Sequence, residues 1–165
     1  MASNPRQAID STDVAILSLL QRDGRMSTAE LAREINMSPS STADRLRRLT
    51  DHGIINGYRA VIDQAAIGHP LTAFVRLRFG GAAKSAFLDM LRNTPQVLEA
   101  HHVTGEDCYL IRVAARSMED LETISTRIAV FGHVTTNIVF ASPIPARPLT
   151  PDLSPTTDAG NAQPE

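Results

Sequence analysis

Serine and arginine side chains are concentrated in one short stretch of the sequence, residues 38–48. Short hydroxyls near a helix N-terminus approach backbone phosphates closely, and the unpaired N–H groups there also favour an anion. A guanidinium binds a phosphate, or the O6/N7 edge of guanine with two hydrogen bonds. This stretch and its neighbours therefore carry side chains suited to double-stranded DNA. The candidate contact residues are Ser27, Ser38, Ser40, Ser41, Asp44, Arg45, Arg47, Arg48 and Arg59.

Two short helices joined by a tight turn, within residues 26–53, are expected to position these side chains. Ser27 and Glu30 match a capping box at the start of the first helix. Ser38 is a good N-cap for the second helix, and Pro39 falls at its first position, where a missing N–H costs nothing.

The second helix is expected to have one packed face and one free face, at about 100° per residue. The packed face consists of Thr42, Ala43, Leu46, Leu49 and Thr50. The free face consists of Ser40, Ser41, Asp44, Arg45, Arg48 and Asp51. This arrangement is typical of a helix-turn-helix, and the alternative is an ordinary pair of amphipathic helices with a solvated charged face.

A third helix is expected before these two, because a two-helix motif cannot close a core alone. Asp10 can cap it with Asp13 at its third position, and apolar residues then repeat at helical spacing until Gly24. Residues 1–8 are expected to be a flexible lead-in, and residues 9–56 the DNA-binding domain.

The hydrophobic period changes beyond this domain. Asn56-Gly57 between apolar residues predicts a hairpin, as a small wing or an extended arm, and residues 57–70 are assigned to a linker strand. Residues 71–141 then show the order strand, helix, strand, strand, helix, strand, which predicts a four-stranded sheet with both helices on one face. The predicted fold class is α+β: a winged helix-turn-helix followed by a βαββαβ ferredoxin-like domain.

The second face of this sheet has no predicted cover. Thr72, Phe74, His101, Val103 and side chains of the fourth strand are candidates for an association surface there, although alternation alone leaves open which set faces outward. The last segment, residues 142–165, is Pro-rich and is expected to be largely disordered.

Composition narrows the classes of function. The 165 residues carry a formal net charge of −2, so DNA binding requires a local basic patch rather than a general attraction. No apolar run approaches the ~20 residues that span a bilayer, and the N-terminus lacks a signal-peptide core, so a cytoplasmic protein without a membrane partner is expected. The lone Cys108 permits no intrachain disulfide.

Enzyme and metal chemistry are weakly supported by these residues. Cys108 has no evident histidine base held by a third group, and no Gly-rich phosphate loop is present, so neither catalysis nor a cofactor is predicted. His101, His102 and His133 lack tight ligand spacing, and consecutive histidines on a strand point to opposite faces, so no metal site is predicted. A metal-responsive regulator and an architectural protein that wraps DNA with little specificity remain the alternatives.

Longer motifs resemble the Lrp/AsnC, or feast/famine, family of transcriptional regulators. The similarity covers Ile9 to about Phe140 and is carried by ILSLLQRDGRMSTAELAREINMS, RLRRLTDHGIINGYRAVID, Gly68 and HHVTGEDCYLIRV. The resemblance implies a sequence-specific DNA-binding regulator whose ACT-like C-terminal module dimerises through its sheets, with dimers often assembling into octamers. It also implies a small amino-acid effector at the interface between these modules.

The effector site that the resemblance implies includes the turn between the second and third strands. The family pattern Gly-x-x-Asp-Tyr reads here from Gly105 to Tyr109, with Cys108 in place of the aspartate. Free N–H groups near Gly105 can hold a carboxylate, while Glu106 or Asp107 can meet an ammonium. A solvated acidic hairpin without a ligand is the alternative. The candidate effector residues are His101, Val103, Thr104, Gly105, Glu106, Asp107, Thr135, Thr136 and Asn137.

Overall fold

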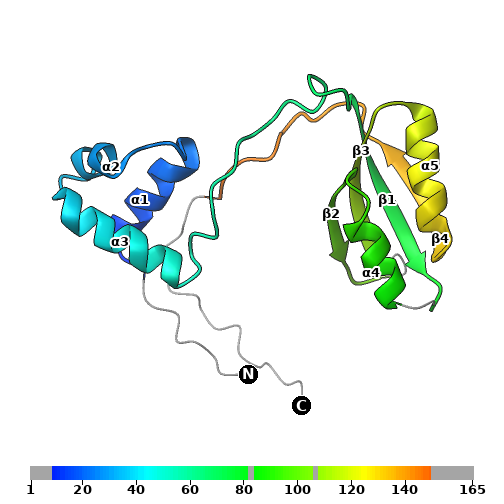
Figure 1. Cartoon of the computed structure of the whole chain (residues 1–165), viewed down its shortest axis with the longest axis horizontal. Coiled ribbons are helices and arrows are strands. Elements are labelled where there is room, and N and C mark those ends of the chain that lie inside the picture. Colours follow the sequence, from blue (N-terminus) through cyan, green and yellow to red (C-terminus); the bar gives the residue numbers. More distant parts are fainter. Residues whose placement is uncertain (1–8, 82–83, 106–107, 150–165) are drawn as a thin grey trace, which may run out of the picture. The chain divides into compact units, whose positions relative to one another are not determined.

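The computed structural model describes residues 9–81, 84–105 and 108–149. The chain divides into two compact units: among the described residues, one consists of 9–60 and 146–149, and the other spans Val61–Pro145. Figure 1 labels the helices and strands of both units. The expected lead-in (residues 1–8), the far end of the expected tail (residues 150–165) and the candidates Glu106 and Asp107 lie outside the described residues.

The first unit contains the three predicted helices: α1 (Ser11–Arg22), α2 (Thr28–Glu34) and α3 (Pro39–Asp51). Each predicted N-cap forms. The Asp10 and Ser27 side chains accept from the backbone N–H groups of Asp13 and Glu30, in two complete capping boxes. The Ser38 side chain accepts from the Ser41 N–H, and Pro39 occupies the first position of α3. Local capping therefore sets where each helix begins.

The core of this unit is small and apolar. Ile16 of α1, Leu49 of α3 and Ile55 are buried together. The turn between α2 and α3 uses Asn36 in the left-handed region, at φ 54°, and the Met37 N–H donates to the Ala32 carbonyl at 2.9 Å. This tight turn holds the start of α3 against α2.

The hairpin at Asn56-Gly57 and the linker strand over residues 57–70 do not form, and of the two predicted alternatives, wing or arm, the segment is an irregular arm. Residues 56–70 are all described, and they contain only a turn at residues 64–68. The N–H groups of Ile54 and Ile55 both donate to the Leu49 carbonyl, at 2.9 and 3.1 Å, so they extend the end of α3 instead of entering a ladder. Val61 is 99% exposed, and a two-stranded ribbon without a buried face is not stable.

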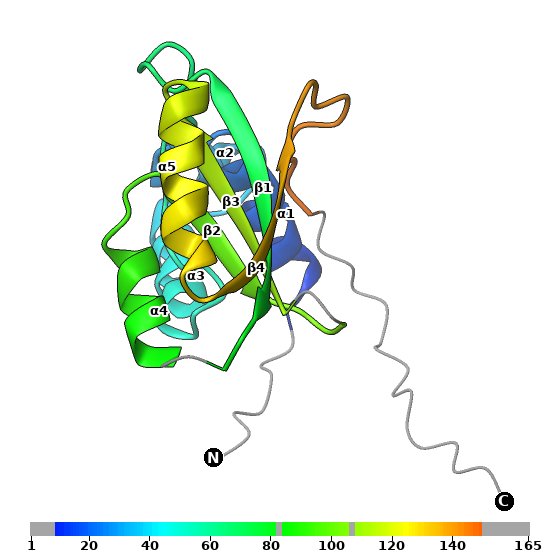
Figure 2. The ribbon, with the colours of Figure 1, turned by 90° about the vertical axis from the view of Figure 1, so that its right-hand side faces the viewer.

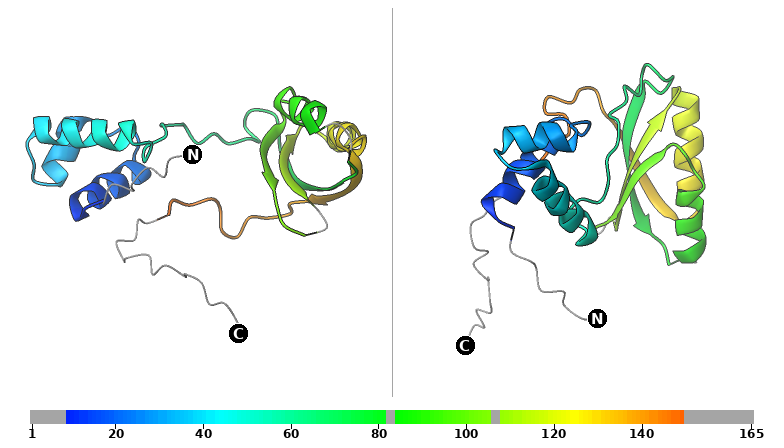
Figure 3. Two further views of the ribbon diagram at one scale, coloured as in Figure 1. Left: turned by 90° about the horizontal axis from the view of Figure 1, so that it is seen from below. Right: turned by 60° about the vertical axis from the view of Figure 1, so that its left-hand side comes forward.

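The second unit has the predicted βαββαβ order. Its elements are β1 (Leu71–Phe79), α4 (Lys84–Arg92), β2 (Val97–His102), β3 (Tyr109–Ala115), α5 (Met118–Ala129) and β4 (Gly132–Ile138). The strands form one antiparallel sheet in the order β2-β3-β1-β4. Figures 2 and 3 show α4 and α5 side by side on one face of this sheet.

The structure resolves which alternate residues face the helices. Ala73, Val75 and Leu77 of β1 are fully buried, in one cluster with Phe87 of α4 and Ile128 of α5. The intervening residues of β1 point to the other face, which no described helix or strand of this unit covers. Register then places on this uncovered face Thr72, Phe74, Arg76, Arg78, Glu99, His101, Leu110, Arg112, Ala114, His133, Thr135 and Asn137.

Within the described residues, the helices are all too short or too polar to cross a membrane.

Gly132 closes the sheet at the start of β4. A Cβ at this position would meet the backbone carbonyl of Arg78 well inside van der Waals contact, and backbone cannot swing away as a side chain can. We therefore expect Gly132→Ala to lower the free energy of unfolding by about 1–3 kcal/mol, measured by denaturant unfolding. Gly80→Ala is the matched control, because its Cβ would lie at an ordinary 3.4 Å from the nearest atom, the Phe131 carbonyl oxygen. Equal stability of the two variants would contradict this packing.

Candidate nucleic-acid interface

Three serine hydroxyls gather at the N-terminus of α3. The Ser38 hydroxyl donates to the Ser41 hydroxyl at 2.8 Å, lies 3.1 Å from the Ser40 hydroxyl and accepts from the Ser41 N–H at 3.2 Å. All three residues are exposed. The cluster stands where the helix dipole is positive, so this end of α3 can receive an anion such as a phosphate.

The exposed face of α3 is narrower than its sequence predicts. Ser40, Ser41, Asp44 and Arg47 are exposed, whereas Arg45 and Arg48 are only partly exposed. Their side chains retain 24% and 39% of their accessible area. The prediction that both arginines point freely away from the protein is therefore wrong. Thr50, expected to pack, is exposed and its hydroxyl donates to the Leu46 carbonyl at 2.9 Å.

Arg45 and Arg48 are held by two carboxylates at the start of α1. Arg45 Nη1 lies 2.7 Å from an oxygen of Asp10 and 2.8 Å from one of Asp13. Arg48 Nη2 donates to both oxygens of Asp13 at 3.0 Å. The Asp13 side chain is only 3% exposed, so its charge is compensated by hydrogen-bonded partners, as a buried carboxylate requires.

The pKa values of two of these groups are shifted from their ordinary values. The pKa of Asp10 is lowered, first by the hydrogen bond from the Asp13 backbone N–H and then by that from the Arg45 side chain. The pKa of Arg45 is raised by its hydrogen bonds to Asp10 and then Asp13. Sequence reasoning assigned these aspartates to helix capping alone. The available signal was the matched spacing, Asp10 and Asp13 three apart facing Arg45 and Arg48 three apart.

The remaining candidate DNA-contact residues differ in their exposure and in their partners within the chain. Arg47 Nη1 lies 3.0 Å from Asp44, with side chains 68% and 70% exposed, and such surface pairs contribute little stability. The Ser27 hydroxyl donates to the Glu30 carboxylate at 2.7 Å. Arg59 is exposed in the irregular segment after α3.

The candidate effector residues do not form one site within a single chain. β2 and β4 are the two edge strands, separated by β3 and β1. His101 on β2 and Thr135 on β4 are therefore about 14 Å apart across the sheet, at about 4.8 Å per strand. Thr135 and Asn137 lie on the uncovered face, whereas Thr136 faces α5, where its hydroxyl is 3.0 Å from that of Ser125.

The described part of the turn after β2 is exposed, and a backbone hydrogen bond joins the two ends of the turn. Val103, Thr104 and Gly105 are exposed, and the Val103 N–H donates to the Cys108 carbonyl at 2.8 Å. Gly105 has φ 107°, in the region that favours glycine.

The histidines of the sheet are dispersed. His101 lies on the uncovered face, with Nε2 3.5 Å from Glu99, while the ring of His102 stacks 4.9 Å from that of Tyr109 on the helix-covered face. The structure therefore confirms that these neighbours face opposite ways. No group of three or more potential metal ligands occurs among the described residues.

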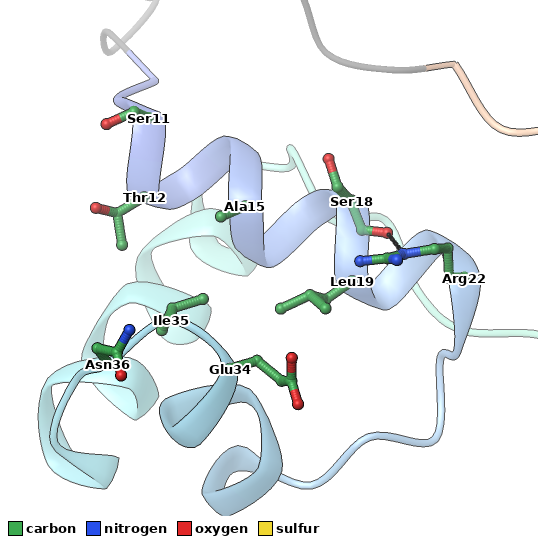
Figure 4. Close-up of a pocket in the computed structure, with 9 residues that line it drawn as sticks. All are labelled: Ser11, Thr12, Ala15, Ser18, Leu19, Arg22, Glu34, Ile35 and Asn36. Atoms are coloured by element: carbon green, nitrogen blue, oxygen red, sulfur yellow. Dashed lines mark hydrogen bonds between the residues drawn. The ribbon is translucent and has the colours of Figure 1, made fainter.

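A groove of about 410 Å³ also opens in the first unit, between α1 and the end of α2. Figure 4 shows Arg22 and Glu34 on its walls and Ile35 facing α1. None of the predicted site residues lines it.

Comparison with known proteins places both units in one family. Residues 9–56 match the family described as winged helix-turn-helix DNA-binding, and residues 72–149 match the Lrp/AsnC ligand binding domain. The transcriptional regulator LrpB of Bacillus subtilis is 31% identical over 125 residues, which cover 76% of this chain and 84% of LrpB. The chain belongs to the Lrp/AsnC family. It is a DNA-binding transcriptional regulator and not an enzyme.

Other Lrp/AsnC relatives agree in sequence and in fold. LrpC of Bacillus subtilis is 29% identical, with 81% of this chain and 92% of LrpC aligned. The LrpC structure superposes with a TM-score of 0.79 and 28% identity over 82% of this chain and 97% of that one. The feast or famine regulatory protein Rv3291c of M. tuberculosis, complexed with L-methionine, gives a TM-score of 0.81 and 29% identity over 87% of this chain and 100% of that one.

Proposed function

We propose that this Lrp/AsnC protein binds a specific, roughly palindromic DNA site as a symmetric dimer, with α3 of each copy in the major groove. The observation that carries this proposal is the serine cluster at the positive end of α3, next to the exposed Asp44 and Arg47. The serines would fix the helix on backbone phosphates, and Arg47 would contact a base edge. Ser27 and Arg59 would add phosphate contacts, and the two grooves would lie about 34–36 Å apart.

The uncovered sheet face supports association of two copies. Phe74, Leu110 and Ala114 share this face, at neighbouring positions of β1 and β3. Phe74 and Leu110 remain partly exposed among the charged side chains of this face, and covering them with a second copy would remove apolar surface from water. We extend the proposal to a cytoplasmic protein whose dimers assemble into octamers, as the family resemblance implies.

We further propose that the protein responds to an amino acid bound between copies. The L-methionine complex of Rv3291c is a family precedent for such a ligand. Because β2 and β4 lie at opposite edges, a site using both His101 and Thr135 needs residues of two copies. Asn137 shares the face of Thr135, whereas Thr136 would join only by giving up its contact with Ser125.

An architectural role is the second candidate. The observation that favours it is the exposed serine cluster at the N-terminus of α3, because its hydroxyls suit backbone phosphates and phosphate contacts carry no sequence information. Similar affinities for a selected site and for random DNA would favour this role, whereas a ratio of ~10³ or more would favour the specific regulator.

Arg47 provides a direct test of base contact by α3. We expect Arg47→Ala to weaken binding to the selected site by about 1–3 kcal/mol while changing affinity for random DNA little, measured by fluorescence anisotropy at fixed salt. Arg92→Ala is the matched control, because Arg92 is an equally exposed helix arginine with an Asp89 partner three residues away at 2.9 Å. Unchanged affinity and specificity in Arg47→Ala would remove this residue from the interface.

The effector proposal is tested by titrating the full-length protein with the common amino acids. We expect an apolar or small amino acid to release or absorb heat in calorimetry and to change either the assembly state or DNA affinity. Asn137→Ala should weaken that response. Thr126→Ala is the control and should leave it unchanged, because Thr126 is exposed on the outer side of α5. The absence of heat and of any change in assembly across the panel would contradict the proposal.

A further inference from the structure

We propose that Asp13 is a positioning residue for DNA recognition, whose buried carboxylate orients Arg45 and Arg48 so that the remaining N–H groups of both guanidiniums face the nucleic acid. This inference rests on the proposed role of α3 as the DNA-reading helix. Among the described residues, each of the two guanidiniums hydrogen-bonds through one nitrogen, which leaves its other nitrogens available to a ligand.

The hydrogen bonds leave donors available on both arginines. Arg48 uses Nη2 for both oxygens of Asp13, and Arg45 uses Nη1 for Asp10 and Asp13. Within the described part of the chain these are the only hydrogen bonds that the two guanidiniums make, so Nε and the second terminal nitrogen of each can donate to a ligand. The side chains of Arg45 and Arg48 keep 24% and 39% of their accessible area, so part of each side chain remains within reach of a ligand at the surface.

Both arginines border the exposed stripe of α3. Arg45 follows Ser41 by four residues, and Arg48 follows Asp44 by four, so each lies one turn further along the face that carries those side chains. A duplex that contacts Ser41 and Asp44 would therefore pass beside both guanidiniums.

The aspartates at the start of α1 exceed what capping requires. α2 is capped by Ser27 with Glu30, and a serine at position 10 would cap α1 equally well. In place of it, α1 has aspartate at both positions of its capping box, and each aspartate also accepts from an α3 arginine. This cap differs from that of α2 because its two carboxylates also bind arginines of α3.

The ion pairs orient the side chains of both arginines without adding net positive charge to the cluster. Two carboxylates balance two guanidiniums, so the cluster adds little to non-specific attraction for DNA. An arginine on a flexible stem must be ordered on binding, and a carboxylate that orders it beforehand lowers that cost. Asp13 should thus contribute to specificity and oppose non-specific affinity.

The test compares full-length wild-type protein with Asp13→Asn on two duplexes of equal length, a site selected by footprinting and a random sequence. Asparagine keeps the shape and one acceptor oxygen but removes the charge. We expect the affinity for the selected site to fall about tenfold and the affinity for random DNA at low salt to rise severalfold. Asp89→Asn, the same change at the exposed Asp89–Arg92 pair of α4, should alter neither affinity.

The outcomes separate positioning from mere stability. Equal losses on both duplexes, or an unchanged ratio between them, would overturn the positioning role. If Asp13→Asn reduces the folded fraction seen by circular dichroism, Arg48→Lys serves as the second test. This variant keeps the positive charge without the planar guanidinium. A wild-type ratio of its affinities for the selected and random duplexes would overturn the inference. Equal wild-type affinity for the two duplexes would contradict the proposed function as well.

Discussion

The contact between the start of α1 and the middle of α3 is the interaction on which the DNA-binding unit depends. Asp10 and Asp13 cap α1 and also bind Arg45 and Arg48, so the helix that begins the fold and the helix that faces outward share one set of carboxylates. The apolar cluster between α1 and α3 is small, with Ile16, Leu49 and Ile55 as its buried members, so the ion pairs between these helices are important for the orientation of α3. Among the four charged side chains only Asp13 is buried, at 3% exposure, so its carboxylate is the one that depends most on both arginine partners.

The C-terminal unit follows a different constraint, namely a sheet with one covered face. The helices bury Ala73, Val75 and Leu77, and the uncovered face combines apolar with charged side chains such as Arg112, which pairs with Glu99 at 2.8 Å. The order β2-β3-β1-β4 sends the candidate effector residues to opposite edges. In the proposed effector site a single copy would therefore supply the residues of one edge only, and ligand binding would be linked to assembly.

Local patterns predicted much of this structure because they act over a few residues. The three N-caps, the turn before Pro39 and the βαββαβ order all depend on near neighbours in sequence. The errors arose where a distant partner decides: a helical wheel gives the angle of Arg45 but cannot show that Asp10, 35 residues earlier, receives it. The Asn56-Gly57 hairpin failed because a turn signal needs a core face to bury, and Thr136 was grouped with its neighbours although a strand alternates.

The central claim is that two copies of α3 read one duplex in successive major grooves. The most direct measurement is the affinity of the full-length protein for its selected site after base pairs are inserted between the two half-sites. An insertion of about 5 bp turns one half-site to the opposite side of the helix and should reduce binding to the level of random DNA, whereas about 10 bp should restore part of it. Affinity that does not depend on this spacing would contradict the account.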